Sequence, residues 1–311
     1  MTVHAFFEGK IVPLEQAKIG VMTHAFNYGT GVFEGIRGYW NEEDEQIYLF
    51  RLREHFERLV NSCKIVKIKL QYSVDEMCDL ATRLVRLNGY REDVYVRPLA
   101  YKSDNLIGVR LHNLDDEFLL YTAPFGAYLE IDKGISCGVS SWRRMDDNMA
   151  PARAKITGLY INSAFAKTEA IENGFDEAIM LTHDGHVSEG SAENIFVIED
   201  GKLITPSVTE NILVGITRNT LIELAQAEFG IETVERQIDR SELYIADEVF
   251  LCGTGAQVSS VISIDHRPVG SAEIGPITKK LQSLYFDVAK GRNKKYAHWC
   301  TPAYDKSAVR S

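Results

Sequence analysis

The spacing of apolar residues divides the chain into alternating strands and helices. In the first part, short apolar runs rich in β-branched and aromatic residues predict strands: "AFFEGKIVPL", "QIYLFRL", "VYVRPLAY" and "EFLLYTAPF". Two segments among these runs, "LREHFERLVNSCKIV" and "SVDEMCDLATRLVRLNG", carry apolar residues at helical spacing. Strands and helices mixed in this way predict an α+β arrangement.

The second part of the chain is richer in strands. The runs that predict them are "GISCGVSSW", "EAIMLTHDGHVSEG", "ENIFVIEDGKLITP" and "ADEVFLCG", with helices at 158–172, 217–229 and 276–290. Two of the runs contain Asp-Gly, in "HDGH" at 183–186 and in "EDGK" at 199–202. Because Asp-Gly readily adopts the positive φ angles of tight turns, both are predicted to be hairpins.

The change of pattern around "FGAYLEIDKG" predicts a domain boundary. We place a smaller α+β domain at residues 1–128 and a larger domain at 129–311, with an interdomain loop at about 125–135. The length of 311 residues agrees with two domains of roughly 150 residues each.

Composition narrows the class of partner. The chain carries 34 Lys and Arg against 44 Asp and Glu, a net charge of −10, and has only one short basic run, "GRNKKY". A nucleic acid or an anionic membrane would require a basic face, so we expect neither and favour small molecules. With 45% hydrophobic residues, the chain can bury a core in each domain.

The cysteines and the N-terminal residues predict a cytoplasmic protein. The five cysteines are scattered and never in CxxC spacing, which argues against a disulfide framework or a zinc cluster. "MTVHAFFEGKIVPL" lacks the features of a signal peptide, and no apolar run approaches the ~20 residues of a membrane span. We therefore expect a reducing compartment.

Lys155 is an unusual lysine in an apolar setting. It lies in "MAPARAKITGLYINSAFAKTEAIENGF", residues 149–175, just before a predicted amphipathic helix. Its stem could pack on apolar surface while its ammonium reaches water. Alternatively it is a Schiff-base lysine, because burial disfavours the charged form and the neutral amine attacks aldehydes. The lysine alone leaves both interpretations open.

An aldehyde cofactor of the pyridoxal type would also need a carboxylate and a phosphate cradle. Glu189, in "HVSEGSAENIFVIED", is suited to be an inward-facing acid, although an ordinary turn carboxylate has the same pattern. Gly215 precedes a helix whose first amides, of Ile216 and Thr217, could bind an anion or be an ordinary cap. Thr254, in "LCGTGAQV", lies in a glycine-flanked loop of a common kind.

Nine motifs together resemble one family. "HAFNYGTGVFEGIR", "FRLREHFERL", "YVRPL", "FGAYL", "SSWRR", "ARAKITGLY", "VSEGSAENIF", "ILVGITR" and "LCGTGAQV" occur in the order found in branched-chain amino acid aminotransferases of the fold type IV pyridoxal-phosphate enzymes. The resemblance spans residues 6 to 290. It implies a small N-terminal α/β sandwich, a larger strand-rich pseudo-barrel domain with the cofactor between them, and a homodimer or a trimer of dimers.

The resemblance also implies roles for individual residues. Lys155 carries the cofactor and is the catalytic base, Glu189 pairs with the pyridine nitrogen, and Tyr160 binds the ring hydroxyl. Three arginines of "FRLREHFERL" are phosphate candidates by pattern, Arg51, Arg53 and Arg58. The resemblance selects Arg58 and adds three further phosphate ligands, Ile216, Thr217 and Thr254.

The substrate pocket is also expected by resemblance. Its residues come mostly from the smaller domain: Tyr28, Phe33, Tyr95, Arg97, Phe125, Tyr128, Gly255 and Ala256. The α-carboxylate is expected near Tyr95 and the amides of 254–256, and the second carboxylate of glutamate at Arg97, for which a structural salt bridge is the alternative. Two features depart from the family pattern: phenylalanine at 125 instead of tryptophan, and bulky residues at 156–157.

The expected reaction is transamination between L-leucine, L-isoleucine or L-valine and 2-oxoglutarate, giving the 2-oxo acid and L-glutamate. Alternatives of the same fold type are a D-amino acid or (R)-amine transaminase and an aminodeoxychorismate lyase. A further alternative is a protein that binds pyridoxal phosphate without catalysing a reaction. "YVR" and "FEGIR" favour an L-amino acid enzyme. Of the eight histidines only His183 and His186 are close in sequence, and HExxH and GxSxG are lacking, so neither metal nor serine catalysis is expected.

Overall fold

The computed structural model describes residues 2–126 and 132–304, which divide into two compact units. The first unit contains Met1–Gly126, Ala154–Leu159 and Asp287–Ser311, and the second contains Ala127–Arg153 and Tyr160–Phe286. The sequence suggested one crossing between domains, near residue 128. In the structure the chain also returns to the first unit twice, because 154–159 and the C-terminal segment pair with strands of that unit.

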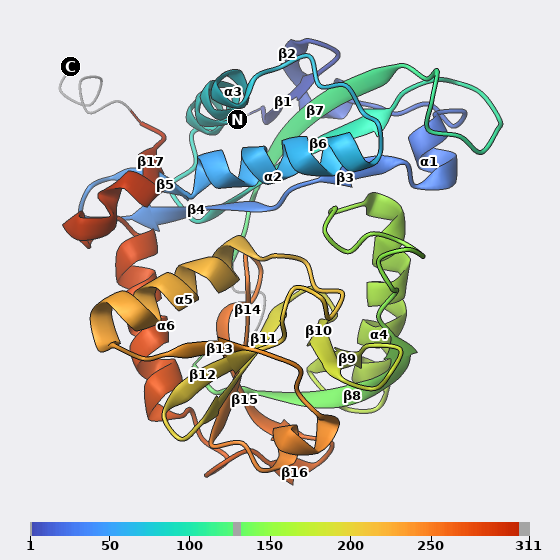
Figure 1. The fold of residues 1–311 in the computed structure, drawn as a ribbon. Helices are drawn as coiled ribbons and strands as arrows, with labels where there is room; N and C mark the ends of the chain where they lie inside the picture. The colour runs from blue at the N-terminus through green and yellow to red at the C-terminus, as the bar shows by residue number, and fades with distance from the viewer. Residues whose placement is uncertain (1, 127–131, 305–311) are drawn as a thin grey trace. The chain divides into compact units, whose positions relative to one another are not determined.

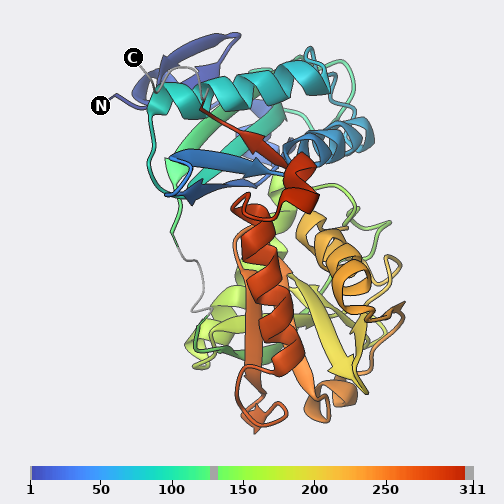
Figure 2. The ribbon, with the colours of Figure 1, turned by 90° about the vertical axis from the view of Figure 1, so that its left-hand side faces the viewer.

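The first unit is built on an eight-stranded, wholly antiparallel sheet. Its strand order is β17-β5-β4-β6-β7-β1-β2, with β3 paired to β6. Figure 2 shows the C-terminal strand β17, in red, beside β5. The strands are β1 (His4–Phe7), β2 (Lys10–Pro13), β3 (Gly31–Phe33), β4 (Ile36–Asn41), β5 (Gln46–Phe50), β6 (Val94–Lys102), β7 (Asp116–Pro124) and β17 (Cys300–Pro302).

Two long helices, α2 (Leu52–Ile65) and α3 (Val74–Asn88), pack together and against this sheet (Figure 1). Helix α3 begins at a capping box formed by Ser73 and Glu76 and ends at Gly89, in the left-handed conformation. Apolar side chains of both helices and of the sheet form one core, as the two helical patterns predict. The shorter helices are η1 (Leu14–Gln16), α1 (His24–Tyr28), η2 (Thr157–Leu159) and η4 (Lys294–Trp299).

The second unit contains a nine-stranded mixed sheet in the order β10-β9-β8-β15-β14-β11-β12-β13, with β16 paired to β15. Strand β10, at one end of this order, lies beside β11 through the tight turn after Gly190, so the sheet curls. The strands are β8 (Ile135–Arg143), β9 (Glu177–Leu181), β10 (Val187–Gly190), β11 (Asn194–Glu199), β12 (Lys202–Thr205), β13 (Thr233–Glu235), β14 (Glu248–Gly253), β15 (Gln257–Ile264) and β16 (Arg267–Pro268). The predicted mixed, strand-rich fold is confirmed.

Both Asp-Gly hairpins of this unit are confirmed. Strands β9 and β10 pair antiparallel around 183–186, and β11 pairs with β12 around Asp200-Gly201, both of which have positive φ. The three predicted helices are also present, as α4 (Tyr160–Glu172), α5 (Ile216–Phe229) and α6 (Pro276–Ala289). The 3-10 helix is η3 (Arg240–Tyr244). Strand β15 was not predicted, because its alternation of serine and apolar residues follows a glycine-rich turn.

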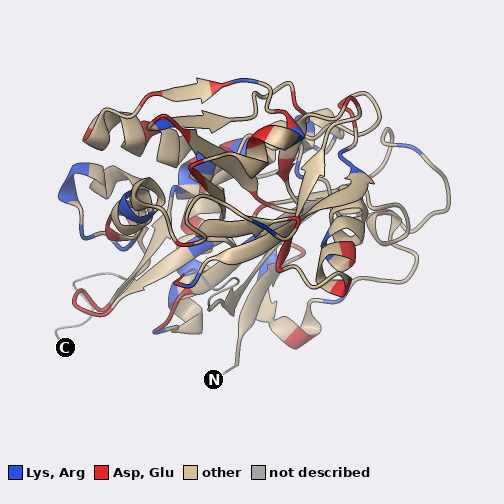
Figure 3. Ribbon diagram, turned by 90° about the horizontal axis from the view of Figure 1, so that it is seen from below, with Lys and Arg blue, Asp and Glu red and all other residues tan. Residues whose placement is uncertain are grey.

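Basic and acidic residues are interspersed along the elements (Figure 3). Among the described residues, no helix combines the length and the apolar character that crossing a membrane would require.

Two glycines allow the returning segment 154–159 to approach the first unit closely. Gly29 ends α1 with a φ of 63°, and the amide of Gly158 donates to its carbonyl oxygen. A Cβ on Gly29 would lie 2.6 Å from Cα of Gly158, so the two backbones touch. Gly230 ends α5 with nearly the same φ, 62°, but a Cβ there would meet no atom within 4 Å.

We therefore expect Gly29→Ala to destabilise the protein more than Gly230→Ala. Gly230→Ala carries only the cost of an alanine in the left-handed conformation, about 1–2 kcal/mol, whereas Gly29→Ala adds a backbone clash to that cost. Urea or thermal unfolding of the two variants measures the difference. Equal losses of stability would contradict the close approach of the two glycines.

Candidate active site

Main-chain hydrogen bonds fix the segment that carries Lys155. The amide of Phe33 donates to the carbonyl oxygen of Lys155 at 3.0 Å, and Val32 forms an isolated bridge with Ile156. The amide of Lys155 donates to Oγ of Ser62, on α2, at 3.3 Å. The segment is thus attached to β3 and α2 on either side of the lysine.

The bulky pair after the lysine has a structural use. Ile156 packs against the core of the first unit. Oγ1 of Thr157 donates towards the carbonyl oxygens of Gly29 at 2.9 Å and Gly31 at 3.2 Å, and it accepts from the amide of Gly31. Both side chains therefore strengthen the attachment of the lysine segment, which smaller residues would not do.

Four of the predicted substrate residues gather beside Lys155 in the first unit. The ring centroid of Phe33 lies 5.1 Å from Nζ of Lys155 and 4.2 Å from Cζ of Arg97. Nη2 of Arg97 donates to the hydroxyl of Tyr95 at 2.6 Å, and the rings of Tyr95 and Phe125 are 4.9 Å apart. An amine, a guanidinium and three aromatic rings thus form one cluster, which we call the Lys155 cluster.

Among the described residues, Arg97 has no partner in a structural salt bridge. Its guanidinium contacts rings and the Tyr95 hydroxyl, and none of the acidic side chains in residues 2–126 and 132–304 forms an ion pair with it. A cation of this kind, lying among aromatic rings, is available to an anionic ligand.

Arg58 meets a buried carboxylate next to this cluster. Its guanidinium binds both oxygens of Glu34, at 2.7 and 2.8 Å, and Nδ1 of His55 lies 2.8 Å from the same carboxylate. Of the other two candidate arginines, Arg51 stacks on Trp299 and the exposed Arg53 pairs with Asp75. Of the three arginines, Arg58 is the one next to the cluster, because its partner Glu34 directly follows Phe33 in the chain.

In the triad of Glu34, His55 and Arg58, the pKa values of Glu34 and His55 are shifted. Burial alone would raise the pKa of Glu34, but the Arg58 guanidinium and, to a smaller extent, His55 outweigh it and hold that pKa far below its usual range. Burial lowers the pKa of His55, although Glu34 opposes the shift. Glu34 is therefore an anion in the folded protein, and Arg58 is its partner in a bidentate pair.

In the second unit, Glu189 is buried and receives three N–H donors. Nη2 of Arg144 lies 2.6 Å from Oε1, and the side-chain amide of Asn194 and the backbone amide of Leu213 donate to Oε2, each at 3.1 Å. This arrangement favours the anionic carboxylate and fixes its orientation. It is an inward-facing acid, not an exposed turn residue.

Asn194 connects Glu189 with the start of α5. Its Nδ2 also donates to the carbonyl oxygen of Leu213 at 2.9 Å, and a Cβ on Gly215 would fall 2.0 Å from its Oδ1. Gly215 is the N-cap of α5 and supplies no capping side chain, and Thr217 is buried in the first turn. A long helix therefore presents its positive end close to the carboxylate.

The turn 254–256 lies at the same edge of the sheet. It joins β14 to β15, and Cys252 of β14 is the register partner of Asn194. Oγ of Ser259 donates to the carbonyl oxygen of Ala256 at 2.7 Å, which stabilises the turn. The second unit thus brings together Glu189, the start of α5 and the loop that contains Thr254.

Glu193, four residues after Glu189, has the opposite electrostatics. Burial and the nearby Glu177 raise its pKa to about 8. At neutral pH Glu193 is therefore largely protonated, whereas Glu189 has a guanidinium partner. Of the two glutamates of "EGSAE", only the first is suited to meet a cation.

The other tyrosines that the sequence predicted for the site come from different elements. Tyr160 is the first residue of α4, directly after the lysine segment. Tyr28 is in α1, where its ring lies 4.7 Å from that of His24 and its hydroxyl accepts from the amide of Gly108. Tyr128, also expected in the pocket, lies outside the described residues.

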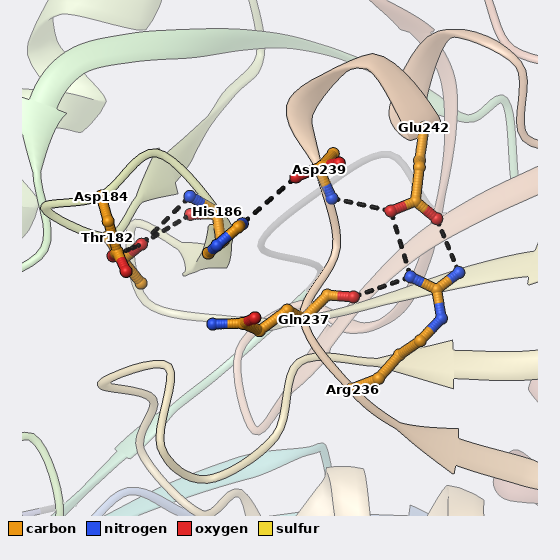
Figure 4. A network of polar contacts seen from close by, with 7 residues as sticks. All are labelled: Thr182, Asp184, His186, Arg236, Gln237, Asp239 and Glu242. Carbon is orange, nitrogen blue, oxygen red and sulfur yellow. Dashed lines mark hydrogen bonds and ion pairs between the residues drawn. The ribbon is translucent and has the colours of Figure 1, made fainter.

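His186, the second histidine of the "HDGH" turn, belongs to a surface network (Figure 4). His186 lies 3.2 Å from Asp239, and Arg236 pairs with Glu242 at 2.6 Å. Within residues 2–126 and 132–304, no group of three or more His, Cys, Asp or Glu side chains is placed to hold a metal ion.

The partners that orient the candidate residues were not predicted from the sequence. They are Glu34, His55, Arg144 and Asn194. A signal existed for two of them. Glu34 is a lone acid within the apolar stretch "GVFEGI", and the second arginine of "SSWRR" lies two residues after a predicted strand. Charged residues at such positions are buried only with a partner, but their partners are remote in the sequence.

Comparison with known proteins identifies close relatives. The model of the family described as amino-transferase class IV matches residues 31–264. A probable branched-chain-amino-acid aminotransferase from Aquifex aeolicus (strain VF5) is 53% identical over 302 residues, which are 97% of each chain. The structure of the branched-chain aminotransferase from Thermoproteus uzoniensis with norvaline has a TM-score of 0.93 and 43% identity, covering 98% of this chain and 100% of that one.

A further solved structure is similar to the same degree. It is the branched-chain amino acid aminotransferase from Thermobaculum terrenum in its PLP-form, with a TM-score of 0.93 and 39% identity. The match covers 98% of this chain and 99% of that one.

The triad in the first unit yields a prediction about pH. Glu34→Gln removes the counter-charge of Arg58, which should cost about 3–5 kcal/mol at neutral pH. Because the folded-state pKa of Glu34 is depressed, its contribution is complete above the usual Glu pKa of about 4.3 and declines as the pH falls below it. The stability gap between wild type and variant should therefore narrow in acid. Glu57→Gln, on the exposed side of α2, is the control and should change stability little; a gap independent of pH would contradict the assignment.

Proposed function

Because this chain belongs to the class IV aminotransferase family, we propose that Lys155 carries its cofactor and that the Lys155 cluster binds its substrates. The chain is a pyridoxal-phosphate-dependent enzyme that transaminates branched-chain amino acids. The observation that carries the proposal is the cluster itself. The amine of Lys155, a residue whose main chain is fixed by hydrogen bonds, lies in one cluster with a guanidinium and three aromatic rings that could receive an amino acid.

The residues present fit pyridoxal 5'-phosphate. The donor set contains an amine for its aldehyde, an anion for its ring nitrogen, and a helix start without a capping side chain for its phosphate. When bound, the cofactor supplies an electrophilic aldehyde and an electron-accepting ring. Tyr160 is proposed to bind its ring hydroxyl. Four groups are proposed to bind its phosphate: Arg58, Ile216, Thr217 and Thr254.

Lys155 is proposed to act as attachment point and base. Its main chain is fixed by Phe33 and Ser62, so the freedom of the side chain lies in its four methylenes. As a free amine, Nζ would be the base that takes the proton from the substrate Cα. Because Nζ stays tethered to a main chain that is fixed on both sides, the same group would also be suited to give that proton back.

Glu189 is proposed to keep a proton on the pyridine nitrogen. Arg144, Asn194 and the amide of Leu213 stabilise its negative charge and leave the carboxylate little freedom to rotate. An oriented anion favours the protonated ring without reorganisation during the reaction. Glu193 could not replace it, since its pKa is raised to about 8.

Arg97 is proposed to let one pocket accept two kinds of side chain. The rings of Phe33, Tyr95 and Phe125 suit a branched aliphatic chain, whereas glutamate and 2-oxoglutarate bring a second carboxylate. Arg97 lies among these rings and has no acidic partner in the described parts of the chain, so it is available to that carboxylate. We therefore propose 2-oxoglutarate as the amino acceptor. The α-carboxylate is assigned to Tyr95 and the amides of 254–256.

We also propose that the enzyme forms a homodimer or a trimer of dimers in the cytoplasm. Four apolar side chains of the first unit are between 72% and 89% exposed: Val21, Phe26, Ile107 and Val109. The two segments that carry them are joined, since Thr23 bridges Asn105 and the amide of His24 donates to Asp104. Contiguous exposed apolar surface supports self-association, which sedimentation analysis can measure. The five free cysteines agree with a reducing compartment.

The attachment site can be tested chemically. We expect the purified protein to be yellow, and borohydride reduction followed by peptide mapping to place the pyridoxyl group on Lys155. Lys167, which is paired with Glu177 at 2.6 Å, is the internal comparison and should remain unmodified. Lys155→Ala should abolish transamination while the remaining groups bind the cofactor weakly. A reduced adduct on any other lysine would refute the proposal.

Arg97→Ala should separate the two substrates. Truncating one member of a charge pair shielded from water costs ~2–5 kcal/mol, while an aliphatic chain offers Arg97 nothing to pair with. The KM for glutamate and for 2-oxoglutarate should therefore rise by at least about tenfold, the factor that ~1.4 kcal/mol represents. The half-reaction with L-leucine should stay within a few-fold of wild type. Equal losses for leucine and glutamate in a folded variant would show that Arg97 is structural or binds the α-carboxylate.

A further inference from the structure

Arg37 is a buried arginine that the proposed chemistry leaves unexplained. It lies on β4 with 3% of its surface exposed, opposite Tyr95 in the register of β4 and β6. Its Nε is 3.5 Å from Oδ2 of Asp93. A buried guanidinium is costly unless it is paired and hydrogen-bonded, so its contacts should show what it does.

These contacts converge on one short segment at the end of β7. Nη2 of Arg37 donates to the carbonyl oxygens of Phe125 at 2.9 Å and Gly126 at 2.8 Å. Its Cζ lies 4.8 Å from the centroid of the Phe125 ring. One planar side chain therefore fixes both the backbone and the ring of Phe125, which the point charge of a lysine could not do. The amide of Phe125 is fixed as well, by the carbonyl oxygen of Asp93 at 2.9 Å.

The position of the Phe125 ring in turn limits Tyr95. The two rings are 4.9 Å apart with their planes at 54°. A Cβ on Gly35 would fall 2.3 Å from the Tyr95 hydroxyl oxygen, so Tyr95 is closely packed on that side too. The same hydroxyl accepts from Arg97. A shift of Phe125 would therefore open space beside Tyr95, within the Lys155 cluster.

We propose that Arg37 is a positioning residue that fixes the Phe125 wall of the substrate pocket and so determines which aliphatic side chains the enzyme accepts. The inference rests on the proposed function, because it takes Phe125 and Tyr95 as pocket residues. A rigid apolar pocket discriminates one methylene by roughly 10- to 200-fold. A wall that can shift accommodates large and small chains alike, and this discrimination is lost.

The test compares kcat/KM for L-leucine, L-valine and L-alanine in holoenzyme preparations of wild type and Arg37→Lys. We expect the ratio of leucine to alanine to fall about tenfold, through a higher KM for leucine, with kcat within about threefold of wild type. Lysine preserves the positive charge beside Asp93 but loses the paired hydrogen bonds and the stacked plane. An unchanged ratio, or a uniform fall for the three amino acids, overturns the proposal.

Arg51→Lys is the matched control. Arg51 is also buried in the first unit, and its Cζ lies 3.8 Å from the Trp299 ring centroid, so the variant loses a comparable stacked guanidinium. The leucine-to-alanine ratio should not change in Arg51→Lys. A similar fall there would show general loosening of the unit and would overturn the specific role of Arg37.

Two more variants keep the proposal falsifiable if Arg37→Lys folds poorly. Asp93→Asn retains an oxygen to accept from the amide of Trp40 but loses the charge beside Arg37, so the ratio should fall by a smaller factor. In a Phe125→Ala background, Arg37→Lys should have no further effect on the ratio, because the wall it positions is gone. An unchanged ratio in the first variant, or a full additional fall in the second, overturns the proposal.

Failure of the proposed function would look different. Wild-type enzyme would then fail to turn over leucine or would carry the cofactor on a lysine other than Lys155. If wild type behaves as proposed and the variants at 37 and 93 do not change the substrate ratio, only the role of Arg37 is refuted.

Discussion

The pairing of residues 154–159 with β3 is the interaction on which the candidate site depends. The hydrogen bond from Phe33 to Lys155, the bridge from Val32 to Ile156 and the contact of two glycine backbones draw a connection between β8 and α4 into the first unit. Main-chain bonds of this kind do not depend on side-chain rotamers, so the lysine starts from a defined position. In the proposed mechanism, its long side chain then supplies the movement that proton transfer at the substrate requires.

Both units place buried charges next to the residues proposed to meet the cofactor. Glu34 is paired with Arg58 in the first unit, and Glu189 with Arg144 in the second. Buried ion pairs contribute little net stability, because desolvation offsets attraction, but removing one partner is strongly destabilising. Their consequence here is orientation: each side chain retains one geometry in which its charge can face a ligand. Glu193 shows the opposite effect, because burial and the nearby Glu177 raise its pKa to about 8.

Local pattern predicted the elements well and their long-range arrangement poorly. Helical spacing identified α2, α3, α4, α5 and α6, and Asp-Gly located both hairpins, since each signal lies within a few neighbouring residues. Strands β3 and β4 were not predicted, because "GTGVFEGIR" is interrupted by glycines that serve close packing, as Gly35 does beneath Tyr95. The return of 154–159 to the first unit has no local signal, because it arises from pairing with residues more than a hundred positions earlier.

The sequence by itself determined which residues could do chemistry: a lysine in an apolar segment, a glutamate suited to face inward, a glycine at the start of a helix, and motifs in the order of a known family. Only the tertiary structure decided which groups orient them. Arg58 binds a glutamate 24 residues earlier, and Arg37 binds the carbonyl of a residue 88 positions later. Such pairs follow from how strands and helices pack, not from local preference, because the energy that makes a buried charge tolerable comes from whichever partner the fold brings within hydrogen-bonding distance.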